Sequence, residues 1–278
     1  MSLRPEQVDR YRRDGMLVIE GLVEASTCDA LRERMGELMA GFDPAGVRTI
    51  FGTSNQSHAL DDWFLESGDK IRFFFEPDSF DAEGALRQPL ELSLNKVGHA
   101  LHDLDPVFAR FSRDPRIEAI ARGLGLAEPL LLQSMYIFKQ PRIGGEVVCH
   151  QDSSFLHTLP MSCVGFWLAL EDADETNGCL LVEPGGHRRP LHQRFVREGR
   201  RTRMEILDPT PLPVSGLTPL PASKGTLIVL HGQLPHRSGP NLSDRSRHAY
   251  TLHLIDGRCS YSPDNWLQRG PDMLLCGF

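Results

Sequence analysis

The chain has 278 residues, of which 40% are hydrophobic and 24% are charged, a composition typical of a globular protein with a substantial core. Asp and Glu (37) outnumber Lys and Arg (30), and the net charge of −7 argues against a binder of nucleic acid or anionic membranes, since both need a cationic face. Six cysteines without a CxxC pair, and an N-terminus without an apolar signal core, predict a cytoplasmic protein with reduced thiols. No linker divides the sequence, so residues 1–278 are expected to form one domain.

The N-terminal part, residues 1–125, is predicted to mix helices with a short strand. A helix over 5–13 should end at Asp14-Gly15 and lead into a strand over 16–19. Ser26 is expected to cap the next helix, in which apolar residues recur every three or four positions. These residues are Leu31, Met35, Leu38 and Phe42. Residues 93–104 and 106–122 show similar spacing and are predicted to be two more helices.

From about residue 126 the pattern changes to strands. Strands are predicted over 131–139, 164–170, 179–182, 226–231 and 249–255. Asn177-Gly178 is a strong signal for a hairpin turn. Short strands at this spacing, without helices between them, predict a mainly β fold of the sandwich or barrel type.

Residues 184–225 stand out by composition. They contain seven arginines between positions 188 and 203, followed by a run of prolines between 209 and 221. Two interpretations remain open. The segment is either a solvated surface loop or a mobile lid, and as a lid its arginines would meet an anionic substrate.

The tripeptide His150-Gln151-Asp152 is the first candidate for chemistry. Residues i and i+2 of a strand project from the same face, so His150 and Asp152 can converge while Gln151 points away. An imidazole nitrogen and a carboxylate oxygen are two of the three ligands in the facial triad of a non-haem Fe(II) site. The pattern HxD is common by chance, however, and alone it is weak evidence.

Downstream residues strengthen this interpretation. His236 supplies a second imidazole, and a reversal at residues 239–244 would bring Arg247, on the returning strand, nearly opposite it. Three protein ligands leave three positions on Fe(II) for a chelating 2-oxoacid and O2. The distant carboxylate of 2-oxoglutarate then needs a bidentate cation such as Arg247. Ser238 can add a hydroxyl donor, and Arg245 is the rival to Arg247.

These residues lie in blocks through which the chain resembles the phytanoyl-CoA dioxygenase family of Fe(II)/2-oxoglutarate oxygenases. The blocks are YRRDGMLVIEGLV (11–23), LNKVGHALH (94–102), QSMYIFKQP (133–141), GGEVVCHQDSSFL (144–156), NGCLLVEPGGH (177–187), HGQLPHRSGPNLSDRSRHAYTLHL (231–254) and SPDNWLQ (262–268). Their order is far more specific than HxD. Gly186 departs from the serine of many members, and the arginine-rich segment has no counterpart that aligns.

The resemblance implies a double-stranded β-helix (a cupin-like jelly roll) over about 126–278, flanked by helices. It assigns Fe(II) to His150, Asp152 and His236, and the distal carboxylate of 2-oxoglutarate to Arg247. It also implies that Lys96, Met135 and Trp167 contact this cosubstrate. From their sequence context alone, Lys96 would be an exposed helix residue and the other two core residues.

The function implied is that of a dioxygenase, which uses O2 and 2-oxoglutarate to hydroxylate or otherwise oxidise a small molecule and releases succinate and CO2. Two alternatives remain open. A zinc hydrolase could use the same His/Asp/His set, although it would not explain Arg247. A jelly-roll sensing module could bind 2-oxoglutarate without productive turnover. The sequence does not identify the substrate.

Overall fold

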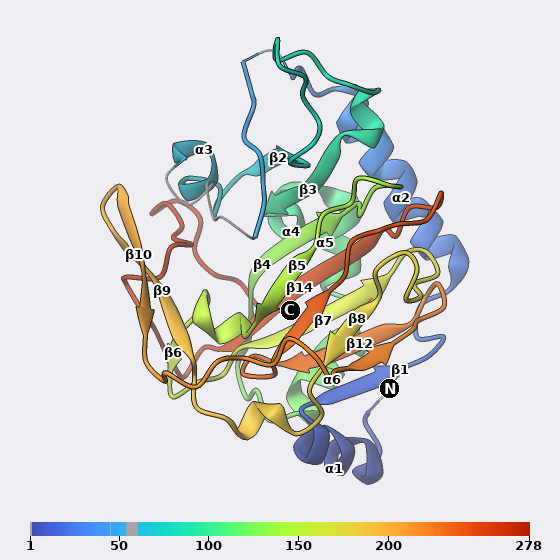
Figure 1. The fold of residues 1–278 in the computed structure, drawn as a ribbon. Helices are drawn as coiled ribbons and strands as arrows, with labels where there is room; N and C mark the ends of the chain where they lie inside the picture. The colour runs from blue at the N-terminus through green and yellow to red at the C-terminus, as the bar shows by residue number, and fades with distance from the viewer. Residues whose placement is uncertain (1, 45, 54–60) are drawn as a thin grey trace.

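A computed structural model describes residues 2–44, 46–53 and 61–278, and Figure 1 shows their arrangement. The helices are α1 (Pro5–Asp14), α2 (Ala25–Ala40), α3 (Asp62–Leu65), α4 (Leu101–Leu104), α5 (Pro106–Ser112) and α6 (Pro115–Gly123), with short 3-10 turns η2 (Leu90–Leu92), η3 (Asp152–Ser154) and η4 (Gly186–Arg188). The strands are β1 (Met16–Ile19), β2 (Ile71–Phe75), β3 (Leu94–His99), β4 (Pro129–Ile137), β5 (Val147–His150), β6 (Thr158–Leu159), β7 (Val164–Ala169), β8 (Leu180–Val182), β9 (Gln193–Glu198), β10 (Arg201–Ile206), β11 (Thr218–Leu220), β12 (Leu227–His231), β13 (His236–Ser238), β14 (Ala249–Asp256) and β15 (Ser260–Tyr261).

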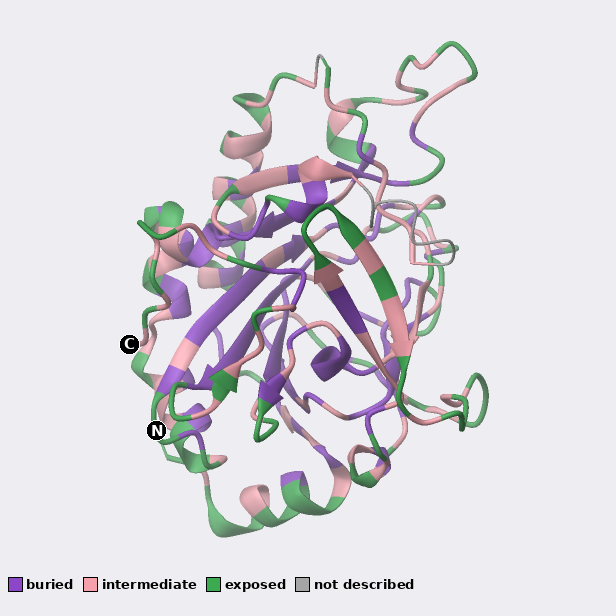
Figure 2. Ribbon diagram, turned by 90° about the vertical axis from the view of Figure 1, so that its left-hand side faces the viewer, coloured by how far each residue is buried: buried purple, intermediate pink, exposed green. Residues whose placement is uncertain are grey.

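Two antiparallel sheets form the centre of the fold. The larger sheet has seven strands in the order β1-β12-β7-β14-β4-β3-β2, and the smaller has four in the order β11-β8-β13-β5. Apart from the short strand β6 and the segment β9–β11, the strands from β4 to β14 alternate between the two sheets. The chain thus forms the predicted jelly roll, and the mainly β fold class is confirmed. In Figure 2 the strands of the larger sheet are mostly buried, whereas the surrounding helices and loops carry the exposed residues.

Strand β7 explains how the sequence builds the two layers. Its alternate residues Phe166 and Leu168 belong to the core between the larger sheet and the helices. Trp167 and Ala169 face the opposite way, into the core between the sheets. Because successive side chains of a strand point to opposite faces, a strand buried on both sides must be apolar at every position. All six residues of β7 are buried.

The first long helix, α2, packs against the outer face of the larger sheet. Leu31 and Met35 are buried there, and Leu38 and Phe42 pack beside them, as their spacing predicts. The expected cap is wrong, because the helix begins at Ala25 and its N-cap position is Glu24, which makes no side-chain capping bond. The helix therefore gains its stability from packing on the sheet.

The predicted helix over 93–104 is wrong. Residues Leu94–His99 form strand β3, which pairs with β2 on one side and β4 on the other, and only the four-residue α4 follows. The spacing of apolar residues in this segment suits a helix. A strand forms instead, because β2 and β4 offer backbone hydrogen bonds to it on both sides. The stretch 106–122 is helical but divided into α5 and α6, because Asp114 accepts a hydrogen bond from the Arg116 amide and starts a new helix at Pro115.

The hairpin predicted at Asn177-Gly178 is also wrong. The strand before it, β7, belongs to the larger sheet, and the strand after it, β8, belongs to the smaller sheet. The turn is closed by a backbone hydrogen bond of 2.8 Å from Cys179 to Asp174, and Gly178 has a positive φ of 84°. A turn therefore forms where the sequence predicts one, but it connects a strand of the larger sheet to a strand of the smaller sheet.

The arginine-rich segment carries its own structure. Strands β9 and β10 form a two-stranded antiparallel hairpin with Gln193 opposite Ile206, and β11 joins the edge of the smaller sheet. The hairpin stands beside the two main sheets, on the left of Figure 1. Among the described helices, none is long and apolar enough to cross a membrane.

Candidate functional site

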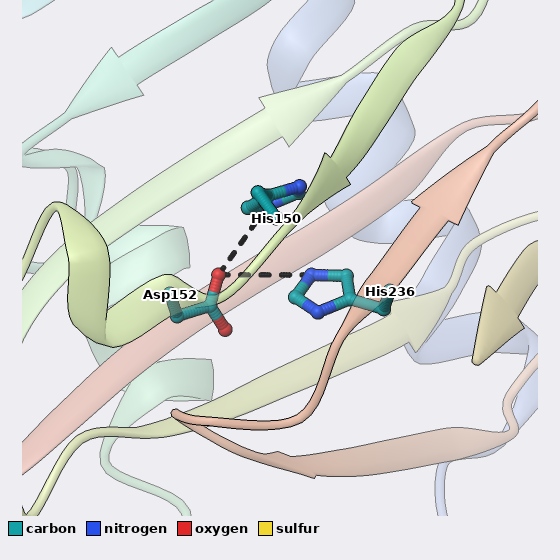
Figure 3. A group of neighbouring side chains, drawn as sticks. All are labelled: His150, Asp152 and His236. Carbon is teal, nitrogen blue, oxygen red and sulfur yellow. Dashed lines mark ion pairs between the residues drawn. The ribbon is translucent and has the colours of Figure 1, made fainter. Parts of the chain in front are cut away.

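Three side chains that can hold a metal meet at the smaller sheet. His150 ends β5 and His236 begins β13, and these two residues are directly opposite each other in the antiparallel register. The Nε2 atoms of both histidines lie 3.6 Å from Oδ1 of Asp152 (Figure 3). One ligand atom from each residue lies within 4.8 Å of the others, so one ion can contact all three.

The backbone sets which nitrogen of each ring is available. Nδ1 of His150 lies 2.9 Å from the carbonyl oxygen of Val148, and Nδ1 of His236 lies 2.9 Å from that of Leu234. A carbonyl only accepts, so Nδ1 carries the hydrogen in each ring and Nε2 keeps its lone pair. Such bonds orient the histidine ligands of metal sites.

Asp152 reaches the histidines in a different way from that predicted. Strand β5 ends at His150, and Asp152 is the first residue of the 3-10 turn η3. The intervening Gln151 does point away, and it is held by hydrogen bonds from its Nε2 to the carbonyls of Pro190 and Gln233. Asp152 therefore faces the histidines through a turn and not through strand alternation.

The charges of the three residues suit a cation. Burial opposes ionisation of Asp152, but the nearby imidazoles of His253, His236 and His150 outweigh it and hold the pKa of Asp152 well below its usual range. Burial and the neighbouring His150 lower the pKa of His236 to about 4. Burial opposes protonation of His150, but the Asp152 carboxylate outweighs it and raises the pKa of that imidazole. At neutral pH, the Asp152 carboxylate and the neutral His236 are therefore ready for a metal ion, which competes with a proton at His150.

His253 completes the surroundings of Asp152, and the sequence analysis missed it. Its Nε2 lies 3.4 Å from Oδ2 of Asp152, on the side away from the other two histidines. A signal was present, since Thr251 and His253 are polar residues at alternate positions within the mostly apolar strand β14. In register with His253 lies Gly165 of β7, which leaves room for the Asp152 carboxylate.

Gly165→Ala is expected to weaken metal binding. A Cβ at this position would lie 2.8 Å from Oδ2 of Asp152, so the carboxylate must move. We expect a loss of affinity of about tenfold, the lower end of the range for disturbing residues that orient metal ligands. Titration of the protein with Mn(II) measures it. Gly239→Ala is the control, because a Cβ there meets nothing within 4 Å, and equal affinities of the two variants would contradict the prediction.

A cavity of about 210 Å³ extends from the triad between the two sheets. The larger sheet presents two rows of side chains to it: His253 is in register with Gly165, and Thr251 is in register with both Met135 and Trp167. The smaller sheet contributes the two histidines and Ser238. The five residues expected to contact 2-oxoglutarate all line this cavity, namely Lys96, Met135, Trp167, Ser238 and Arg247.

Lys96 differs from a surface lysine in every respect. It lies on strand β3, not on a helix, and only 5% of it is exposed. Its Nζ lies 3.3 Å from the ring centre of Phe51 and 3.7 Å from Sδ of Met135, and burial holds the pKa of Lys96 well below its usual range. A buried amine with such weak partners is suited to an anionic group in the cavity.

Arg247 also lines the cavity, but not through the predicted reversal. His236 is on the smaller sheet, whereas Arg247 precedes β14 of the larger sheet, so the expected hairpin is wrong and the two residues reach the cavity from different sheets. The Arg247 guanidinium lies 5.3 Å from the Trp167 ring centre, and its Nε donates to the carbonyl of Gly178. Its buried Nη1 has no hydrogen-bond partner among the described residues. The rival Arg245 is exposed and paired with Asp174.

Aromatic side chains form the outer wall of the cavity. Phe155 follows η3, and its ring centre lies 5.7 Å from that of Phe195 on β9. The rings of Phe64 and Trp266 stack with centres 4.2 Å apart. All four line the cavity, and the hairpin thus contributes an aromatic residue where the sequence suggested arginines.

The seven arginines of the segment, all within the described part of the chain, do not line the cavity. Several of them bind other parts of the protein. Arg194 pairs with Asp264 at 2.8 Å, Arg197 donates to the carbonyl of Leu65, and Arg200 pairs with Asp62. These contacts attach the β9–β10 hairpin to α3 and to the C-terminal segment.

Arg197→Ala is expected to loosen the hairpin without changing the affinity for 2-oxoglutarate. The Arg197 guanidinium donates to the carbonyls of Leu65 and Trp266, and a segment with fewer such bonds opens more often. Hydrogen exchange of residues 193–206 should become faster than in wild type. Arg201→Ala is the control, because residue 201 is exposed at the hairpin tip. Unchanged exchange in Arg197→Ala would show that these bonds do not hold the hairpin.

The chain is similar in sequence to known proteins of one family. The family model described as "Phytanoyl-CoA dioxygenase (PhyH)" matches residues 11–249. The chain is 46% identical over 269 residues to "Phytanoyl-CoA dioxygenase" of Arabidopsis thaliana, covering 96% of this chain and 94% of the relative. It is also 46% identical over 281 residues to "Phytanoyl-CoA dioxygenase domain-containing protein 1" of Bos taurus, covering 98% and 97%.

Solved structures share the fold at low sequence identity. The α-ketoglutarate-dependent carbocyclase SnoK from nogalamycin biosynthesis matches with a TM-score of 0.65 and 19% identity, over 94% of this chain and 87% of SnoK. EctD from S. alaskensis, in a structure with bound Fe, matches with a TM-score of 0.65 and 21% identity, over 96% and 82%. These likenesses support the jelly-roll architecture.

Proposed function

Because this chain belongs to the phytanoyl-CoA dioxygenase family of Fe(II)- and 2-oxoglutarate-dependent oxygenases, we propose that it oxidises a small molecule with His150, Asp152 and His236 as the iron ligands. The observation that carries this proposal is the cavity itself, which holds both the largely buried His/Asp/His group and a buried arginine whose Nη1 has no hydrogen-bond partner among the described residues. A metal-chelating acid with a second carboxylate matches both features.

The donor set fits Fe(II). Two neutral imidazoles and one carboxylate form the facial triad that leaves positions open for other ligands. When bound, the iron supplies the activation of O2 that protein side chains cannot perform. The protein contributes the remaining tasks: Val148 and Leu234 hold the rings by their carbonyl oxygens, His253 holds Asp152, and the buried walls exclude water.

We assign the cosubstrate-binding roles to the residues that line the cavity beyond the triad. Arg247, with Ser238 nearby, binds the distal carboxylate of 2-oxoglutarate, and Trp167 supports the guanidinium from one side. Lys96 is a second basic residue of the cavity and serves the metal-chelating end, with Met135 beside its Nζ. The electrostatic contribution of both cations is large, because burial removes the water that would otherwise screen them.

The substrate side of the cavity is walled mainly by Phe155, Phe195, Phe64 and Trp266. Such a surface favours a small molecule with an apolar face. The anionic substrate expected from the arginine-rich segment lacks support, because the seven arginines do not line the cavity and several of them bind the protein itself. Recognition of an acyl-CoA by them lacks support for the same reason.

Formation of succinate from 2-oxoglutarate in air tests the proposal. The purified protein loaded with Fe(II) should form succinate slowly without substrate, whereas metal-free and Zn(II)-loaded samples should form none. Binding of 2-oxoglutarate without any succinate would favour the sensing module instead. Absence of both binding and turnover, with a hydrolytic activity in the Zn(II) form, would favour the zinc hydrolase.

A further inference from the structure

Lys139 is a buried lysine beside the arginine end of the cavity, and the proposed function assigns it no role. It lies two residues beyond β4, lines the cavity and is only 2% exposed. Its backbone has a φ of 44°, a left-handed conformation that is unfavourable for residues other than glycine. The surrounding structure therefore holds this lysine in place at a cost in free energy.

Neighbouring glycines make room for Lys139. A Cβ on Gly178 would lie 2.7 Å from Cε of Lys139, and a Cβ on Gly144 would lie 2.9 Å from its carbonyl carbon. The carbonyl oxygen of Lys139 accepts hydrogen bonds from the Arg247 amide and from Nδ2 of Asn241. The same short segment therefore fixes the positions of both Lys139 and Arg247.

The Lys139 ammonium decides the direction of one hydroxyl group. Its Nζ donates to the carbonyl oxygen of Gly145 at 2.6 Å and to Oγ of Ser238 at 2.9 Å. In its ammonium form, which a bound carboxylate favours, Lys139 has no lone pair, so Ser238 accepts this bond and its own hydrogen points elsewhere. Ser238 also lines the cavity, and among the described residues its Oγ has Lys139 as its one hydrogen-bond partner.

The charges at this end of the cavity call for one more anion. Lys139 and Arg247 are both buried, and the buried carboxylate near both of them is Glu76, whose Oε2 accepts from the Gly145 amide. Burial raises the pKa of Glu76 to about 7, and burial together with the nearby Arg247 lowers the pKa of Lys139 to about 7, so each of these two groups carries only part of its charge at neutral pH. A ligand carboxylate at this end favours the charged forms of Lys139 and Arg247.

We propose that Lys139 is a positioning residue for the cosubstrate: by donating to Oγ of Ser238, it directs the serine hydrogen toward the distal carboxylate that Arg247 binds. This inference rests on the proposed function, which supplies the carboxylate. It adds that Lys139, acting through Ser238, contributes to selectivity for a dicarboxylate 2-oxoacid over a monocarboxylate one.

The test is calorimetric titration of Mn(II)-loaded protein without O2, using 2-oxoglutarate and 2-oxobutyrate. The two acids share the metal-chelating end, but 2-oxobutyrate lacks the distal carboxylate. Lys139→Met keeps the aliphatic stem and removes the charge, and we expect it to weaken 2-oxoglutarate binding about 10- to 100-fold while leaving 2-oxobutyrate binding unchanged. Ser238→Ala should weaken 2-oxoglutarate binding in the wild-type background and have little further effect in Lys139→Met.

Lys70→Met is the control, because this lysine is exposed and paired with Asp69 outside the cavity. Should Lys139→Met fail to fold, Lys139→Gln replaces it, with an affinity for 2-oxoglutarate expected between those of wild type and a variant without a donor. Unchanged binding of 2-oxoglutarate, or an equal loss for both acids, would overturn the inference. Failure of the wild-type protein to bind either acid would instead overturn the proposed function.

Discussion

Asp152→Ala should abolish both metal binding and succinate formation while the protein remains folded. The variant keeps two histidines but loses the anionic ligand between them, which lies 3.6 Å from each Nε2. Removing residues that merely orient metal ligands costs 10- to 100-fold in affinity, so we expect a loss of more than about 100-fold here. Bound iron measured after dialysis, together with succinate formation, gives the result.

Asp152→Asn separates the effect of charge from that of shape. The amide fills the same space among His150, His236 and His253, so a defect as large as that of alanine would assign the effect to the charge. Circular dichroism of both variants checks the fold. Metal content and turnover at the wild-type level in Asp152→Ala would remove this residue from the metal site.

Arg247→Ala should weaken 2-oxoglutarate binding by about 2–5 kcal/mol, the range for truncating one partner of a buried charge pair. The guanidinium is 2% exposed and has an unpartnered Nη1 at the cavity, so the distal carboxylate would lose its main donor. Metal binding should be nearly unchanged, because Arg247 is not among the residues of the triad. Titrations with Mn(II) and then with 2-oxoglutarate measure the two affinities separately.

Arg245→Ala is the matched control for this prediction. Arg245 is two residues away, but it is exposed and paired with Asp174 at 2.7 Å, so its loss should leave both affinities unchanged. A larger defect in Arg245→Ala than in Arg247→Ala would mean that Arg245, and not Arg247, binds the distal carboxylate. An equal loss of metal binding in Arg247→Ala would indicate a general disturbance of the cavity.

Much of the candidate site was predictable because chemistry restricts the choice of residues. A histidine two residues before an aspartate, a later histidine and an arginine beyond it form a pattern that depends on residue type and order. The structure brings His150, Asp152 and His236 together and places Arg247 in the same cavity. The roles of these residues, like the single-domain organisation and the cytoplasmic location, stay predictions.

The sequence analysis did not find His253, Gly165, Glu76 or Lys139. Each of them matters through a neighbour that is distant in sequence: His253 and Gly165 through Asp152, and Lys139 through Ser238. The polar position of His253 within β14 was a visible signal, whereas Lys139 has no local feature that distinguishes it from a structural residue. The pairing of β14 with β7 sets His253 against Gly165, and Lys139 reaches Ser238 of β13 from the segment that follows β4.

Local patterns were sufficient wherever a segment makes its own structure. The periodicity of α2 and the alternation in β7 follow from residue spacing, because a helix or strand face must be apolar to be buried. Residues 94–99 and the turn at Asn177-Gly178 were assigned wrongly, because hydrogen-bonding partners far along the chain decided them. His236 and Arg247 likewise meet across two sheets and not along one hairpin. The residue types therefore specified the chemistry, whereas strand pairing over long sequence distances specified where each side chain lies.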